Sequence, residues 1–150
     1  MKKGGVVVVS RKLALNELFR WIWKNIFLPK LRTSGKRLKI VRVERFNRQK
    51  GTIYGFATMG DKYDVIAINN KFTGNSEEDV RTIIHELAHI IFESVQWITI
   101  FHTRIYDFEG IFLHCLTQKE KCKLLSYIPS KTISWKEYQK IHAQAFYKSR

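Results

Sequence analysis

The chain has 150 residues, of which 45% are hydrophobic and 13% aromatic, and these proportions exclude a disordered segment and fit one domain with its own core. Two cysteines are too few for a disulfide framework and favour a reduced, cytoplasmic setting, and no apolar run reaches the roughly 18–20 residues of a membrane span. The net charge of +14 favours attraction to a polyanion such as nucleic acid, although a solvated basic surface would carry the same charge.

The first predicted element is a helix over Leu13–Leu28. Before it, the apolar run Val6–Val9 is too short for a signal sequence and is followed directly by Arg11. Apolar residues within the range recur at helical spacing, and we expect Pro29 to end the helix. The recurring residues are Leu15, Leu18, Phe19, Ile22 and Ile26.

Three short strands are predicted next, over Lys39–Phe46, Thr52–Ala57 and Tyr63–Ile68. Each is rich in β-branched or aromatic residues, and turn-forming residues such as Gly51 and Gly60 lie between them. The links between the strands are short and contain glycine. This favours an antiparallel meander over parallel strands joined by crossovers.

A second helix is predicted to begin at Asn75 or Ser76. Each of these residues can cap a helix and has an acidic residue three positions later, and acidic side chains favour the positive end of a helix. The helix is then apolar nearly all round, which is typical of a helix buried between layers. Its apolar residues are Val80, Ile83, Ile84, Leu87, Ala88, Ile90, Ile91 and Phe92.

A last helix is predicted after Ser134, which has Glu137 three residues later as a capping partner. No repeat, low-complexity tract or linker divides the chain, so we expect a single domain over residues 1–150. Its predicted class is α+β, with an N-terminal helix, a small antiparallel sheet, a central helix and C-terminal helices. One face of the last helix is formed by Trp135, Tyr138, Ile141, Ala145 and Phe146.

The central helix carries His85, Glu86 and His89 in the order His-Glu-Leu-Ala-His. Residues four apart lie on the same helix face, so both imidazoles can reach one ion. Zinc binds neutral histidine nitrogens, and a catalytic zinc site leaves one position for water. Glu86 is suited to take a proton from that water as it attacks a peptide carbonyl. Alternatively, both histidines could belong to the core and pair with backbone or carboxylate groups.

A third metal ligand has to come from outside this motif. The following residues include His102, Asp107, Glu109 and His114, and the sequence leaves the choice among them open. No glycine or proline interrupts the chain between Asn75 and Gly110. If one helix ran throughout, His102 would lie about 20 Å from His89. The β-branched and aromatic run from Trp97 to Phe101 predicts that the helix ends first.

The residues around the central helix resemble the SprT-like zinc peptidases, the group that includes Spartan. The resemblance rests on the strand Tyr63–Asn69, the acidic helix start Glu77–Val80 and the motif His85–His89, and it extends over about residues 51–112. Members of this group usually have glycine after the third histidine, where this chain has Thr103. Many also carry a C-terminal zinc ribbon with paired cysteines, which this chain lacks.

The resemblance implies a zincin-like fold that binds Zn²⁺ through His85, His89 and His102. His102 follows His89 by thirteen residues and has Tyr106 four positions beyond it, as in the family. It also implies that Glu86 is the catalytic base, and Tyr106 could donate a hydrogen bond to the developing oxyanion. Tyr106 packing beneath the site without a catalytic role is the alternative.

Basic residues are concentrated in the first third of the chain. On a sheet, Tyr54 and Phe56 would place aromatic rings for base stacking among cations that bind phosphate. Cys115 and Cys122 are interpreted as buried or free thiols, since they are too few for a second metal site. Nucleic-acid binding is assigned to Arg42, Arg45, Arg48 and Lys50.

These features predict a cytoplasmic zinc endopeptidase that acts on DNA-associated proteins. An extended protein substrate is expected to add to a free edge of the strand Tyr63–Ile68. One alternative is a regulatory peptidase that cleaves a repressor-like partner and uses Asp107 or Glu109 as an acidic third ligand. The other is a non-catalytic, basic nucleic-acid-binding module in which the motif only stabilises the fold.

Overall fold

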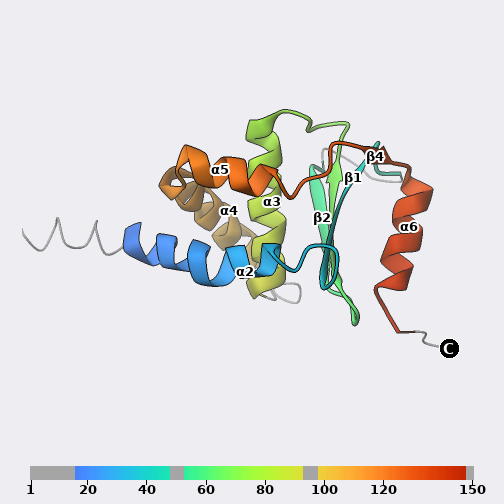
Figure 1. Ribbon diagram of the computed structural model, residues 1–150, viewed down its shortest axis with the longest axis horizontal. Helices are drawn as coiled ribbons and strands as arrows, with labels where there is room; N and C mark the ends of the chain where they lie inside the picture. The colour runs from blue at the N-terminus through green and yellow to red at the C-terminus, as the bar shows by residue number, and fades with distance from the viewer. Residues whose placement is uncertain (1–15, 48–52, 93–97, 148–150) are drawn as a thin grey trace, which may run out of the picture.

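A computed structural model describes residues 16–47, 53–92 and 98–147, and for residues 98–104 it describes the backbone alone. The domain is of mixed α and β structure, with α3 and α6 on opposite faces of one sheet (Figure 1). Among the described residues, no helix has both the length and the hydrophobicity needed to cross a bilayer. The strands are β1 (Leu38–Val43), β2 (Gly55–Thr58), β3 (Asp64–Asn69) and β4 (Thr132–Ile133). The α-helices that follow the N-terminal helical segment are α3 (Ser76–Phe92), α4 (Ile98–Cys115), α5 (Gln118–Leu125) and α6 (Trp135–Gln144).

The sheet has the strand order β2-β3-β1-β4 and is mixed. β1 runs parallel to both β3 and β4, whereas β2 is antiparallel to β3. The predicted antiparallel meander is therefore wrong. The link from β1 to β2 spans residues 44–54, which is long enough to pass over the position that β3 then takes between them. The uninterrupted apolar run Val65–Ile68 is typical of such a central strand, which is buried on both faces.

The N-terminal helix does not end at Pro29. Residues 16–22 are α-helical, a π-helical turn follows over Trp23–Phe27, and α2 (Leu28–Leu31) contains the proline in its first turn. The N–H of Leu28 bonds to the carbonyl of Trp23, five residues back. Proline has no N–H to donate, and its ring would clash with a carbonyl of the preceding turn in a regular α-helix. The wider π-helical turn before Pro29 relieves this clash, so the helix continues to Leu31.

The central helix α3 begins as predicted. Its N-terminus is capped by Asn75, whose Oδ1 accepts a hydrogen bond of 2.9 Å from the Glu78 N–H. A separate helix, α4, begins at Ile98, which confirms that the central helix ends before His102. The β-branched run itself is helical from Ile98 onward, and Gly110 lies inside α4 without ending it.

Both remaining helices begin with a capping box. The prediction for α6 is confirmed, since Ser134 and Glu137 form the reciprocal bonds of that motif. Helix α5 was not predicted, although Thr117 and Glu120 form the same pair at its start. A short helix of this kind has little apolar periodicity, so the cap is its main sequence signal.

The sheet separates two hydrophobic clusters. Alternate residues of β3 point to opposite faces, so Ile66 and Ile68 join the cluster under α3, while Val65 and Ala67 join the cluster under α6. The larger cluster includes the aromatic contacts between the N-terminal helix and α4, such as Phe27 with Phe112 at 4.7 Å between ring centroids. Helix α3 is thus fixed between the sheet and α4, and this fixes the residues that it carries.

Candidate active site

Two histidine nitrogens of α3 converge at its centre. The Nε2 atoms of His85 and His89 are 3.2 Å apart, and the ring centroids are 4.8 Å apart. The helix positions the rings because its other faces are anchored by fully buried residues such as Ile84 and Leu87. Two nitrogen ligands of one tetrahedral zinc ion, each about 2.0–2.1 Å from the metal, are themselves about 3.3 Å apart. The observed separation therefore fits two ligands of the same ion.

The other nitrogen of the His85 ring faces a buried carboxylate. Nδ1 of His85 is 2.9 Å from Oε1 of Glu109 on α4, and Glu109 is only 4% exposed. A carboxylate can only accept, so Nδ1 is the donor in this contact, and Nε2 is the ring nitrogen that faces His89. This is the arrangement in which proteins hold metal-binding histidines. Arg81 balances the second oxygen of Glu109 at 3.5 Å.

The side chain of Glu86 is buried beside β2. Burial raises the pKa of its carboxyl to about 7, an effect that His85 partly offsets and Glu109 reinforces. The strand approaches so closely because residue 55 is glycine. A Cβ atom at Gly55 would lie 2.6 Å from Cγ2 of Thr82 and 3.1 Å from Cγ of Glu86. The sheet therefore lies directly against the helix at the residue predicted to be the base.

Helix α4 supplies the opposite side of this site. The ring of Tyr106 lies 4.8 Å from the His85 ring between centroids, and the tyrosine side chain is exposed. Positions 102, 106 and 109 follow one another at helical spacing, so the backbone places His102 on the face of α4 that carries Tyr106 and Glu109. The side chain of His102 lies outside the described part, within which no three His, Cys, Asp or Glu side chains form a metal-binding group.

The other candidate third ligands are also residues of α4. Asp107 and His114 are exposed residues of α4, while Glu109 is engaged with Nδ1 of His85. From the sequence, Glu109 was a possible ligand, and pairing of the histidines with carboxylate groups was the alternative; the contact of His85 with Glu109 is such a pairing. The spacing of seven residues between His102 and Glu109 was the available signal, since it places both on one helix face.

The free edge of the sheet is β2, not β3. β3 lies between β2 and β1, so the predicted substrate edge at Tyr63–Ile68 is wrong. The Asn69 N–H bonds to the Tyr54 carbonyl at 2.8 Å, which identifies these two as a hydrogen-bonded pair. Because such pairs alternate along antiparallel strands, Gly55 and Ala57 direct their N–H and C=O groups away from β3. Among the described strands, only β3 pairs with β2.

Arg42 does not belong to a nucleic-acid-binding surface. It is 8% exposed, and its guanidinium forms two hydrogen bonds with Asp79 at the start of α3, of 2.8 and 3.2 Å. A third bond, of 3.0 Å, runs to the carbonyl of Pro129. The prediction for Arg42 is wrong because its charge is neutralised inside the fold. It joins β1 to the helix that carries the histidines.

The remaining residues assigned to nucleic acid are placed in part. Arg45 is exposed beyond the end of β1, whereas Arg48 and Lys50 lie outside the described residues. Tyr54 is 40% exposed and Phe56 is 53% exposed, both at the free edge of the sheet.

In comparisons with known proteins, no protein-family model, curated protein or solved structure matches this chain.

Proposed function

We propose that this chain is a zinc endopeptidase of the SprT-like type. The observation that supports it best is the pair of Nε2 atoms of His85 and His89, 3.2 Å apart, with Glu109 on the far nitrogen of His85. Zinc would be held by these two histidines and by His102. When bound, the ion supplies Lewis acidity, which polarises a peptide carbonyl and acidifies water.

Side-chain and backbone groups of the protein would transfer the proton and position the substrate. Glu86 is the proposed base, because its buried carboxyl directly follows the proposed ligand His85 on α3 and lies beside the edge strand β2. Tyr106 is the proposed hydrogen-bond donor to the oxyanion, since its exposed ring lies beside His85. The outward N–H and C=O groups of Gly55 and Ala57 would hold an extended substrate along β2, next to Glu86.

We also propose that the substrates are proteins associated with DNA. The net charge of +14 supports this, because it attracts a polyanion over a distance of several ångströms beyond contact. Arg45 is an exposed cation close to the sheet. The regulatory alternative, with an acidic third ligand, now depends on Asp107, because Glu109 is engaged with His85.

Zinc binding is the first test of this proposal. The purified chain, saturated with zinc and then freed of excess ion, should contain one zinc per chain by mass spectrometry of the metal. His89→Ala and His102→Ala should each lose it while circular dichroism shows an intact fold, because two remaining ligands do not complete a tetrahedral site. His114→Ala, which removes an exposed histidine of α4, is the matched control and should keep it.

The outcomes separate the two peptidase proposals. Zinc retained by the His102→Ala variant would favour Asp107 as the third ligand. A wild-type chain that takes up no zinc would overturn both. Casein cleavage that is lost on chelation and restored by zinc would link the ion to the reaction.

Glu109 should set zinc affinity without touching the ion. We expect Glu109→Gln to weaken zinc binding about 10–100-fold, because the amide keeps the size of the side chain but loses the charge that fixes the His85 ring. Competition with a coloured chelator measures this change. Asp107→Asn alters an exposed carboxylate on the same helix and should leave the affinity unchanged. Equal affinity in Glu109→Gln and wild type would show that the 2.9 Å contact has no part in metal binding.

A further inference from the structure

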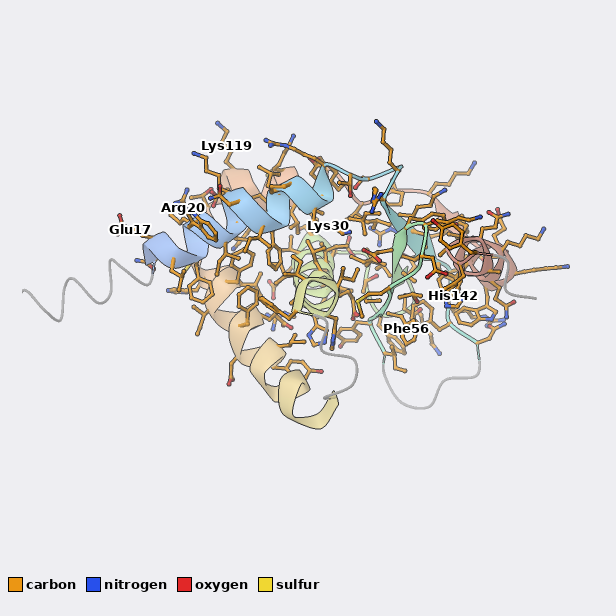
Figure 2. The ribbon with its side chains drawn as sticks, turned by 90° about the horizontal axis from the view of Figure 1, so that it is seen from below. Glu17, Arg20, Lys30, Phe56, Lys119 and His142 are labelled. Atoms are coloured by element: carbon orange, nitrogen blue, oxygen red, sulfur yellow. The ribbon has the colours of Figure 1, made fainter. Side chains whose placement is uncertain are left out.

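A pocket of about 370 Å³ lies between the free edge strand β2 and helix α6. Its walls are Phe56, Trp135, Tyr138, Gln139 and His142, and these five residues are called the aromatic pocket below. Figure 2 shows Phe56 and His142 near one another at the end of the molecule that holds α6. The site described above is on the other face of the sheet and uses none of these residues.

The aromatic pocket is built into the fold rather than left between loose side chains. Tyr138 is 4% exposed, and its ring is stacked on that of Phe46 with 6.4 Å between the ring centroids. The ring centroid of Trp135 is 5.0 Å from that of Tyr138, and the ring centroid of His142 is 5.9 Å from it. Phe56, in contrast, is 53% exposed and forms the open side. Tyr138 is therefore a buried wall of the pocket, and Phe56 is an exposed wall that lies on the free edge strand.

The chemistry of the walls favours an uncharged aromatic group. No carboxylate or ammonium group is among the described residues that line the pocket. The lining residues of α6 recur at helical spacing on one face, and Lys136 and Lys140 fall outside that face. Stacked and edge-on ring contacts favour an aromatic guest over an aliphatic one of similar size. A nucleotide would also need cations for its phosphate, and the described lining contains no lysine or arginine.

The position of Phe56 on the free edge strand indicates how an aromatic group could be placed in the pocket. Side chains alternate along a strand, so position 55 faces Glu86 on α3 and position 56 faces α6. A polypeptide paired with the outward groups of Gly55 and Ala57 would alternate in the same way. One of its side chains would lie toward α3, and the next would lie toward the aromatic pocket.

We propose that the aromatic pocket binds a Phe, Tyr or Trp side chain of an extended polypeptide paired with the edge of β2. The pocket would thus select substrates by an aromatic residue directly adjacent to one that faces α3. This proposal rests on the proposed function, because it assigns part of the substrate preference of the proposed peptidase. Binding itself does not require catalysis or metal, and this allows the two proposals to be tested apart.

The experiment uses fluorescein-labelled seven-residue peptides of threonine and serine with Phe, Leu or Ala at the centre. Binding to the full chain carrying Glu86→Gln is followed by fluorescence anisotropy, so cleavage cannot interfere. We expect the Phe peptide to bind about tenfold to a hundredfold more tightly than the Ala peptide, with Leu between them. Failure of the Phe peptide to bind, or equal binding of Phe and Ala, would overturn the proposal.

Two variants locate the effect in the pocket. Phe56→Ala removes the exposed wall, and Gln139→Trp fills the space from an exposed position, so neither should unfold the chain. Each should remove most of the preference for Phe. Trp21→Ala is the matched control, since Trp21 is a 56% exposed aromatic residue that does not line the pocket. A preference that survives both pocket variants would overturn the assignment.

A second ligand separates the alternatives. A fluorescein-free oligothymidine added to the same mixture should not displace the Phe peptide, and displacement abolished by Phe56→Ala would instead show a nucleic-acid site. Casein cleavage by the wild type is measured in parallel. Cleavage without a Phe preference would leave the proposed function standing and overturn the pocket. A Phe preference without cleavage would support the pocket and count against the peptidase.

Discussion

Glu86→Gln should reduce casein cleavage about 10²–10⁴-fold while the chain keeps its zinc, because removing a general base has an effect of this size. Glu86 is 7% exposed, and burial raises the pKa of its carboxyl to about 7, so this side chain is not a solvated surface charge. The amide keeps the shape of the side chain beside Gly55 but cannot take a proton. Initial rates at pH 7.5 with saturating zinc measure the change.

Two observations make this result interpretable. Glu77→Gln changes an exposed carboxylate in the first turn of the same helix and should leave the rate unchanged. Zinc content measured on the same preparation shows that the loss is chemical rather than a loss of metal. Equal rates for Glu86→Gln and wild type would defeat the enzyme proposal and favour a non-catalytic, basic nucleic-acid-binding module.

Asp79→Ala should lower the free energy of unfolding by about 3–5 kcal/mol, because it leaves the guanidinium of Arg42 buried without its counter-charge. Asp79 is 5% exposed and holds Arg42 with two bonds, the shorter of 2.8 Å. The same carboxylate also accepts from the Gly74 N–H at 3.3 Å, just before α3. In a domain of this size the expected loss of melting temperature is about 6–20 °C. Thermal and urea unfolding measure it.

A surface ion pair provides the comparison. Arg20 and Glu120 are 2.8 Å apart, but the Arg20 side chain is 49% exposed. Arg20→Ala should therefore cost about 1 kcal/mol or less, since water competes for both charges. If Asp79→Ala were no more costly than Arg20→Ala, the pair between β1 and α3 would not be holding the helix in place.

The features that could be predicted from the sequence depend on neighbours along the chain. The cap at Asn75, the capping box at Ser134 and the four-residue spacing of the histidines are all local, so residue type and spacing were sufficient. The end of the central helix before His102 was also predicted, although the β-branched run on which that prediction relied is itself helical from Ile98 onward. Local signals also predicted three strands to within a few residues of their bounds.

The features that were missed depend on which segments meet. The apolar run of β3 is typical of a central strand, but it does not indicate which strands lie on either side, and the strand order decides which edge is free. Arg42 was assigned to the surface because its partner, Asp79, lies 37 residues away. The contact of Glu109 with His85 likewise spans 24 residues. A sequence without aligned relatives gives no indication of such pairs.

The direct contact of β2 with α3 has a consequence for how fixed the enzyme's geometry would be. Residue 55 borders the proposed chemistry and residue 56 borders the aromatic pocket, yet the two are joined by one peptide bond. Successive residues of a strand advance by about 3.4 Å along it. A movement of α6 relative to α3 would weaken binding in the aromatic pocket or slow the reaction. It could not change the number of residues between the position bound in the pocket and the position at the proposed catalytic site.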